Sequence, residues 1–141
     1  MKSLFITLLF LIGASGSWAQ SQQASHAPAK SLFSMTHGTY FDLQHDAAAT
    51  SADSYLNILD WLQGRVAGLQ VYTLRDGTRV PVLRNQLASI YVDDIRYDAD
   101  ILDLLPVQDI AGVKVIKTPG IFTGPGGAIA IYTKPVETEE V

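Results

Sequence analysis

Apolar residues recur in short blocks between residues 51 and 134, and clusters of turn residues separate these blocks. In the first block, SYLNILDWLQGR, the leucines Leu56, Leu59 and Leu62 recur every third residue with other apolar residues beside them. This spacing predicts a helix with a broad apolar face. Residues suited to its ends are Ser51 and Asp53 as N-caps, and Gly64 and Gly68 as the glycine that ends it.

Five further blocks predict strands, because they alternate apolar and polar residues or are rich in β-branched residues. The first two flank the turn sequence RDGT, in which Asp76-Gly77 is suited to a type I′ hairpin turn. Pro81, inside the second block, cannot donate to a neighbouring strand and indicates an edge position or a bulge. The predicted strands cover residues 69–74, 79–84, 87–94, 112–118 and 128–134.

A second, shorter helix is predicted over residues 97–105, where Asp98 or Asp100 would cap the first turn and Pro106 would end it. Residues 107–110 would add one further helical turn. The order is therefore helix, strand, strand, strand, helix, strand, strand, which predicts a small α/β or α+β domain. We favour the α+β class, a small mixed β-sheet with two short helices, over a doubly wound nucleotide-binding fold.

The segment 1–19 has the pattern of a secretory signal peptide. Lys2 precedes an apolar run that ends before Gly13, and Ser17 and Ala19 are small residues at the two positions that a signal peptidase reads. We expect cleavage after Ala19 and export of the mature chain. The apolar run is too short to be interpreted first as a membrane span, so we expect no transmembrane segment in the mature chain.

The next segment, residues 20–50, is rich in Gln, Ser, Ala and Thr, and this composition predicts a flexible linker. Phe33, Tyr40 and Phe41 interrupt it, so part of the linker could lie against the domain. The predicted organisation is a signal peptide at 1–19, a linker at 20–50, a domain at 51–134 and an acidic tail at 135–141.

Composition limits the function classes further. A length of 141 residues is enough for one domain. Without the signal segment, nine Lys and Arg residues stand against fourteen Asp and Glu residues, a net charge of −5 that argues against a nucleic-acid partner. The chain has no cysteine, so disulfides, a lipid-modified cysteine, thiol catalysis and cysteine-bound zinc are excluded.

The stretch GIFTGPGGAIAIYT, residues 120–133, could be a phosphate-binding loop or a tight connection between two strands. A phosphate loop is followed by a helix whose N-terminus meets the anion. Here the following segment is short and β-like, no Lys-Ser or Lys-Thr pair follows Gly127, and the G-x-G-x-x-G pattern is absent. We therefore predict a connection between strands, in which Gly124, Gly126 and Gly127 adopt positive φ.

The remaining residues with chemical potential do not converge on a site. Five aspartates lie within the stretch DDIRYDADILD, but a calcium loop needs a glycine at its sharp turn, so we interpret them as a turn and a helix cap. The histidines lie in the predicted linker, at spacings too wide for a zinc site. We expect no catalytic residue, no metal, no cofactor and no enzymatic activity. These histidines are His26, His37 and His45.

Three separated stretches together resemble the plug domain of TonB-dependent outer-membrane receptors, in particular the SusC-like group of Bacteroidetes. ILDWLQGRVAGLQV (58–71) is similar to the family's helix with LQGR-x-x-G-x-x-V. SIYVDDIRYDADILDLLPVQDIAGVKVIK (89–117) is similar to its Y-V-x-D-G hairpin, its P-x-D-I turn and its I-x-V-(I/L)-K strand. IFTGPGGAIAIYTK (121–134) is similar to the glycine turn and the I-x-I-x-T-K strand that close the plug.

This resemblance implies a plug-like fold related to TonB-dependent nutrient uptake. In complete receptors of the family, the plug blocks the pore of a β-barrel of about 22 strands and contributes to ligand contact. Basic residues at the positions of Arg84 and Lys117 face carboxylates on the barrel wall in the family, which makes these two the candidates for partner contact. The implied partner is an outer-membrane β-barrel or another envelope protein. The implied location is the periplasm or the periplasmic side of the outer membrane.

The sequence also departs from the family's pattern. The family's R-G pair is here Arg84-Asn85, and its D-G pair is Asp93-Asp94. The sequence ends seven residues after Lys134, and a barrel needs many more strands. We therefore expect an exported stand-alone plug-like domain that acts as a binding or interaction module. The alternatives are a vestigial or truncated receptor fragment without transport activity and, less favoured, an enzyme or small-ligand carrier.

Overall fold

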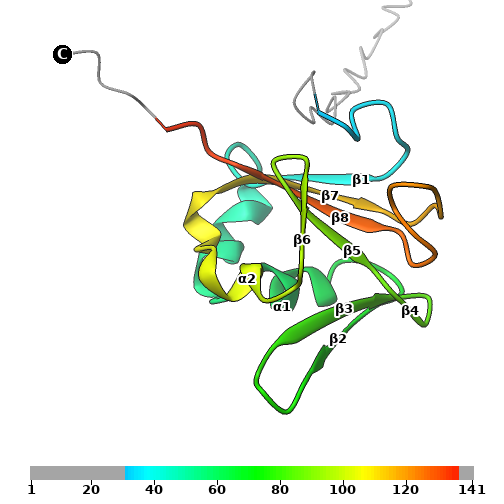
Figure 1. Ribbon diagram of the computed structural model, residues 1–141. Helices are drawn as coiled ribbons and strands as arrows, with labels where there is room; N and C mark the ends of the chain where they lie inside the picture. Colours follow the sequence, from blue (N-terminus) through cyan, green and yellow to red (C-terminus); the bar gives the residue numbers. More distant parts are fainter. Residues whose placement is uncertain (1–30, 137–141) are drawn as a thin grey trace, which may run out of the picture.

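The computed structural model describes residues 31–136, without the side chains of residues 48–50 (Figure 1). The signal peptide expected at 1–19, the first part of the expected linker and most of the acidic tail lie outside these residues. The elements are β1 Thr39–Asp42, the 3-10 helix Ala47–Ser54, α1 Ile58–Gln63, β2 Leu69–Thr73, β3 Arg79–Leu83, β4 Gln86–Leu87, β5 Ser89–Val92, β6 Ile95–Tyr97, α2 Ile101–Leu104, the 3-10 helix Val107–Asp109, β7 Ile110–Ile116 and β8 Ala128–Thr133.

The strands of residues 31–136 form two sheets (Figure 1). The larger sheet has the order β1-β7-β8-β5-β6, in which β5 and β8 run parallel and the other neighbours run antiparallel. The smaller sheet has the antiparallel order β2-β3-β4. The predicted α+β class, with a mixed sheet and two short helices, is confirmed, whereas the sequence pattern does not predict the second sheet.

The helices cover one face of the five-stranded sheet (Figure 1), and the main apolar core lies between the helices and this face. The four apolar residues of α1 are buried in one cluster with residues of β7 and β8. Trp61 meets the ring of Phe41 on β1 edge-on, with the ring centroids 5.4 Å apart. Its Nε1 donates to the Oγ of Ser51 at 3.0 Å, so the buried indole keeps a hydrogen-bond partner.

The first helix begins later than the sequence predicts. Neither Ser51 nor Asp53 caps it, because Ala47–Ser54 forms a separate 3-10 helix. Asn57 is the N-cap, and its Oδ1 accepts from the N–H two residues later at 2.9 Å. Its Nδ2 donates to Oδ1 of Asp103 on α2 at 2.8 Å, so the cap also ties the two helices together. No helix in the described part of the chain is long and apolar enough to cross a membrane.

The segment predicted as a linker contributes to the fold. β1 pairs with β7 at one edge of the five-stranded sheet, so the folded domain begins before residue 51. Ahead of β1, the segment 31–36 lies on the sheet face opposite the helices, where Phe33 is only 2% exposed. The ring of Phe33 meets that of Tyr91 edge-on, with centroids 4.8 Å apart. The flexible-linker interpretation therefore does not hold for residues 31–46.

Lys114 on β7 holds this N-terminal segment in place. The residue is 6% exposed, and its Nζ donates to the carbonyl oxygens of Phe33 at 2.7 Å and Ser34 at 3.4 Å. No carboxylate pairs with it within residues 31–136, and burial lowers the pKa of its ammonium group. The two carbonyl groups therefore supply the polar contacts that a buried cation requires.

Two tyrosines on this face should titrate late. Burial is the main reason why the pKa values of Tyr40 and Tyr132 are raised above the ordinary 10.0. The charge of Asp42 raises the pKa of Tyr40 further. A hydrogen bond with Ser31 at 2.9 Å partly lowers the pKa of Tyr132. Because the folded state holds these protons more tightly, their stabilising contribution is complete below the unfolded pKa and is lost as pH rises through the folded values.

Ultraviolet titration of tyrosinate should therefore show two groups that ionise late. The variants Tyr40→Phe and Tyr132→Phe should each remove one of them. Tyr72→Phe, at an exposed position, should leave both late groups in place and serves as the control. A titration in which every tyrosine ionises near its ordinary pKa would contradict this reading of the buried face.

The turn after β2 differs from the predicted type I′ hairpin. Leu74 and Thr78 close a three-residue loop, in which the Leu74 N–H donates to the Thr78 oxygen at 2.8 Å. Of the loop residues only Gly77 has positive φ, at 91°, whereas a type I′ turn needs two such residues. The carboxylate of Asp76 instead accepts from the Thr78 N–H at 3.0 Å and stabilises the loop from inside.

The two turns that lack the family's glycine still use left-handed backbone. Arg84 and Asn85 have φ of 52° and 65°, and Asp93 and Asp94 have φ of 48° and 68°. This conformation is unfavourable for residues with a Cβ. Asp93 offsets it, because its carboxylate accepts from Thr133 N at 2.9 Å and from Thr133 Oγ1 at 2.6 Å. The Asp93–Asp94 turn therefore forms without a glycine.

The glycine-rich stretch connects β7 to β8, as predicted. Gly124 and Gly127 have positive φ, at 67° and 79°. Gly126 is not among the residues with positive φ, so that part of the prediction is wrong. Its role is close approach, since a Cβ there would overlap the carbonyl oxygen of Leu87.

Candidate functional site

The two basic residues predicted for partner contact lie at one loop. Arg84 lies in the β3–β4 turn, and its backbone N–H donates to the carbonyl oxygen of Gly68 at 3.3 Å. Lys117 follows β7, and its Nζ donates to the carbonyl oxygen of Ala67 at 2.7 Å. The fold thus brings residues from distant parts of the sequence against consecutive residues of the α1–β2 loop. We call Arg84 and Lys117 the basic corner; their role in partner contact stays a prediction.

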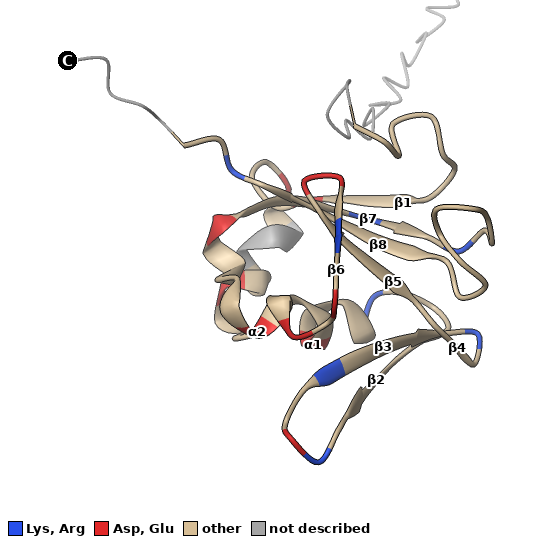
Figure 2. Ribbon diagram, in the orientation of Figure 1, with Lys and Arg blue, Asp and Glu red and all other residues tan. Residues whose placement is uncertain are grey.

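The acidic side chains of the helices and the two residues of the basic corner lie in different parts of the fold. Figure 2 shows acidic positions along α1, α2 and the β5–β6 turn, and basic positions in the β3–β4 turn and after β7. Arg79 is paired internally, with its guanidinium 3.1 Å from both Asp60 and Asp103. Neither residue of the basic corner forms an ion pair within residues 31–136. Its charge is therefore available to an external carboxylate.

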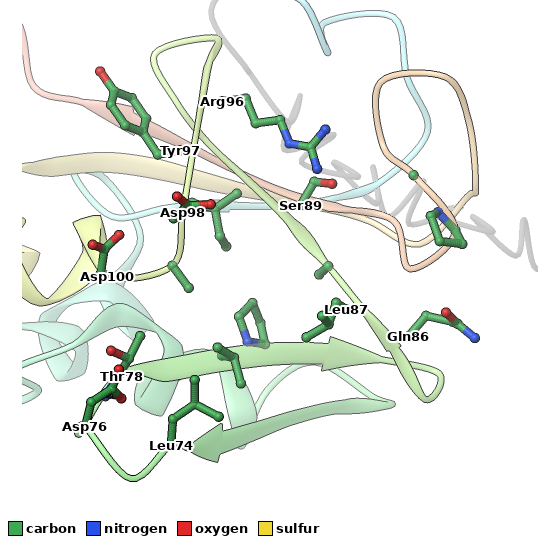
Figure 3. Close-up of a pocket in the computed structure, with 17 residues that line it drawn as sticks. Leu74, Asp76, Thr78, Gln86, Leu87, Ser89, Arg96, Tyr97, Asp98 and Asp100 are labelled. Carbon is green, nitrogen blue, oxygen red and sulfur yellow. Dashed lines mark hydrogen bonds between the residues drawn. The ribbon is translucent and has the colours of Figure 1, made fainter.

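An open cleft of about 660 Å³ lies where the two sheets diverge (Figure 3). One wall is the β2–β3 hairpin with its turn, and the other is formed by β5, β6 and the segment that leads to α2. Leu74, Val80 and Leu87 provide apolar surface on the hairpin side. On the other side Tyr97 provides exposed ring surface, and Ile90 lines the cleft but is only 2% exposed. Leu74 and Leu87 are 49% and 65% exposed, so apolar surface at this cleft faces solvent.

The charged side chains that line the cleft are mainly acidic. Figure 3 shows Asp98 and Asp100 near α2, at the same end as Asp76 on the opposite wall. The hydrogen bond from the Thr78 N–H lowers the pKa of Asp76, so this carboxylate is already engaged. The side chains of Asp98 and Asp100 have no hydrogen-bond or ion-pair partner within the described chain. Arg96 is the one cationic side chain of the described lining.

The residues considered for metal or acid–base chemistry remain dispersed. The described residues contain no group of three or more His, Asp or Glu side chains that could hold a metal ion. His45, expected in the linker, directly follows the β1 region, and its Nδ1 lies 3.0 Å from Asp42 Oδ2. Burial by itself would raise the pKa of Asp42, but hydrogen bonds from Gln44 and His45 lower it overall. This pair is exposed and lies outside the cleft lining.

No protein-family model matches the sequence, and comparison with curated proteins finds no match. Among solved structures, a chain in the structure of the RagAB peptide importer in the "open-open" state resembles this fold, with a TM-score of 0.52 and 20% sequence identity. The folds are related. The similar region covers 70% of this chain and 12% of the importer chain, so this chain corresponds to a small part of that protein.

The sequence alone identifies the basic corner only through the family resemblance and does not identify the cleft. The cleft lining comes from the β2–β3 hairpin, the β4–β5 segment, the β6–α2 segment and the β7–β8 loop. No motif links these segments. The one local signal is the pair of exposed leucines, Leu74 and Leu87, which lie at strand ends where polar residues are more usual.

Proposed function

We propose that this chain is an exported plug-like domain that acts as a stand-alone binding module, not as an enzyme, at the periplasmic side of the outer membrane. Its partner would be an outer-membrane β-barrel of a nutrient-uptake system, contacted through the basic corner. The observation that carries the proposal is that Arg84 and Lys117 meet at one loop without an internal ion pair. The related fold in the RagAB peptide importer and the three plug-like motifs support it.

The chemistry of the basic corner suits acceptance of carboxylates from a partner. Lys117 uses one donor on the Ala67 carbonyl, and an ammonium group has three. The Arg84 side chain is exposed, and a guanidinium can bind a carboxylate through two parallel hydrogen bonds. Charges at the rim of an interface mainly raise the association rate and its salt dependence.

Removal of both charges should weaken partner binding about fivefold. We would use the processed full chain to capture proteins from the native outer-membrane fraction, and identify them by mass spectrometry. We expect recovery of a β-barrel protein. The variant Arg84→Gln/Lys117→Gln should recover less of it, and that recovery should depend less on salt because fewer charge pairs are screened.

A matched control is the variant Arg75→Gln/Lys134→Gln, which removes the same charge at exposed positions outside the basic corner. It should bind as the unmodified chain does. Equal losses in the two double variants would contradict a specific role for Arg84 and Lys117. A folded chain that captures no envelope protein would favour the alternative of a receptor fragment without activity.

A further inference from the structure

We propose that the cleft between the β2–β3 hairpin and β6 binds an extended peptide segment with basic side chains, which adds to the five-stranded sheet beside β6. The proposal goes beyond the contact assigned to Arg84 and Lys117, because neither residue lines this cleft. It combines an open strand edge, an apolar wall and unpaired carboxylates at one place in the fold.

The outer edge of β6 is open to a further strand. In the order β1-β7-β8-β5-β6, no strand of the described residues pairs with β6 on the side away from β5. The two-residue turn makes Val92 and Ile95 the hydrogen-bonded closing pair of the hairpin, so the next pair, Tyr91 and Arg96, is not hydrogen-bonded. The N–H and C=O of Arg96 therefore point outward, as strand addition requires.

The strand across the cleft offers a poorer edge. Pro81 of β3 has no N–H to donate, and its carbonyl oxygen already accepts from the Ala88 N–H at 3.0 Å. The end of β3 is also covered by β4, which pairs at Val82 and Leu83. Of β3 and β6, which face each other across the cleft, β6 is thus the strand that can pair with an incoming segment.

A segment beside β6 would direct every second side chain toward the cleft. Ile90 and Tyr97 are directly opposite one another on β5 and β6, so they share a face of the sheet, and both line the cleft. Side chains of the added strand on that face would approach the apolar surface of Leu74 and Leu87. This contact would remove from water the apolar surface that the free domain exposes.

The charges of the cleft favour basic side chains on the incoming segment. Asp98 and Asp100 lie at one end without internal partners, and Asp76 lies on the wall opposite them. An acidic segment would meet these carboxylates with only Arg96 to balance them. A segment that alternates apolar and basic residues satisfies both the apolar wall and the acidic end.

The test uses the full chain and three short fluorescent peptides: one of alternating valine and lysine, one of alternating valine and glutamate, and the valine–lysine peptide N-methylated at every backbone nitrogen. Fluorescence anisotropy should show binding of the lysine peptide only, because N-methylation removes the donors that pair with β6. Bound peptide should also slow hydrogen exchange of the Arg96 amide, which a contact through side chains alone would not do.

The variant Asp98→Asn/Asp100→Asn should weaken binding of the lysine peptide about fivefold. The control variant Asp53→Asn/Asp109→Asn removes the same charge at exposed positions outside the cleft and should leave binding unchanged. Equal binding of the glutamate peptide, binding that leaves Arg96 exchange unchanged, or absence of binding would each overturn the proposal. Arg84→Gln/Lys117→Gln should not affect this assay, so the two proposals fail independently.

Discussion

Replacement of Gly126 by alanine should destabilise the domain by about 3 kcal/mol or more. The new methyl group would overlap the carbonyl oxygen of Leu87 and lie 2.8 Å from that of Gln86. Both are backbone atoms of β4, so no side-chain rotation can relieve the overlap, and either β4 or the β7–β8 connection has to move. Urea denaturation followed by far-ultraviolet circular dichroism measures the loss directly.

The matched control is Gly64→Ala at the end of α1. A Cβ at Gly64 has no atom within 4 Å, and its φ of −80° is accessible to alanine. This variant should leave the free energy of unfolding unchanged or raise it by about 0.4–1 kcal/mol, because alanine restricts the unfolded chain. Similar denaturation midpoints for the two alanine variants would show that the close approach at Gly126 does not constrain the fold.

Replacement of Phe33 by alanine should lower the free energy of unfolding by about 3 kcal/mol. The ring is 2% exposed, packs against Tyr91 and belongs to the apolar cluster on the sheet face opposite the helices. Its loss should also loosen the contact between Lys114 and the carbonyl oxygens of residues 33 and 34. Hydrogen exchange of the segment 31–36 should therefore become faster, in addition to the shift in denaturation midpoint.

Met35→Ala is the control within the same segment. Met35 is 96% exposed, so its truncation should change stability by no more than about 0.5 kcal/mol. If Phe33→Ala also left the free energy of unfolding unchanged, the segment 31–36 would contribute little to the fold, and its interpretation as a linker would be supported.

The strands that the sequence predicts well are those whose environment is local or uniform. β7 and β8 are buried on both faces, so apolar and small residues fill β7, apart from Lys114, and β8, and the pattern is clear. Alternating apolar and polar residues on both sides of the RDGT turn predict the β2–β3 hairpin. They do not predict its exact turn type, because the difference between a two-residue and a three-residue loop depends on how the strands pair.

The elements that the sequence misses owe their existence to distant partners. β1 is four residues long within a polar segment, and it forms because Thr39 and its neighbours pair with Val115 and its neighbours on β7. β6 consists of three exposed residues that follow a turn without glycine. Its sequence therefore favours an earlier start of the helix predicted next, not a strand. In both cases tertiary pairing overrides a weak local preference.

The candidate sites depend on tertiary structure even more strongly. Arg84 and Lys117 stand out in the sequence only through the family resemblance, and nothing in their spacing indicates that both reach the α1–β2 loop. The cleft is invisible to pattern analysis because Asp76 and Asp98 approach it from opposite walls. Identification of such a site requires the arrangement of two sheets, only one of which the sequence predicts.

Among residues 31–136, β8 is the last strand along the chain, yet it lies between β7 and β5 in the sheet. Until residues 128–133 have been synthesised, the two halves of the sheet lack the strand that joins them, and pairs such as Ser89 with Ala128 cannot form. Assembly therefore waits for the whole domain, and contacts this distant in sequence are typical of slow folding. A chain cut short before β8 would expose two bare strand edges at once, and such edges promote aggregation.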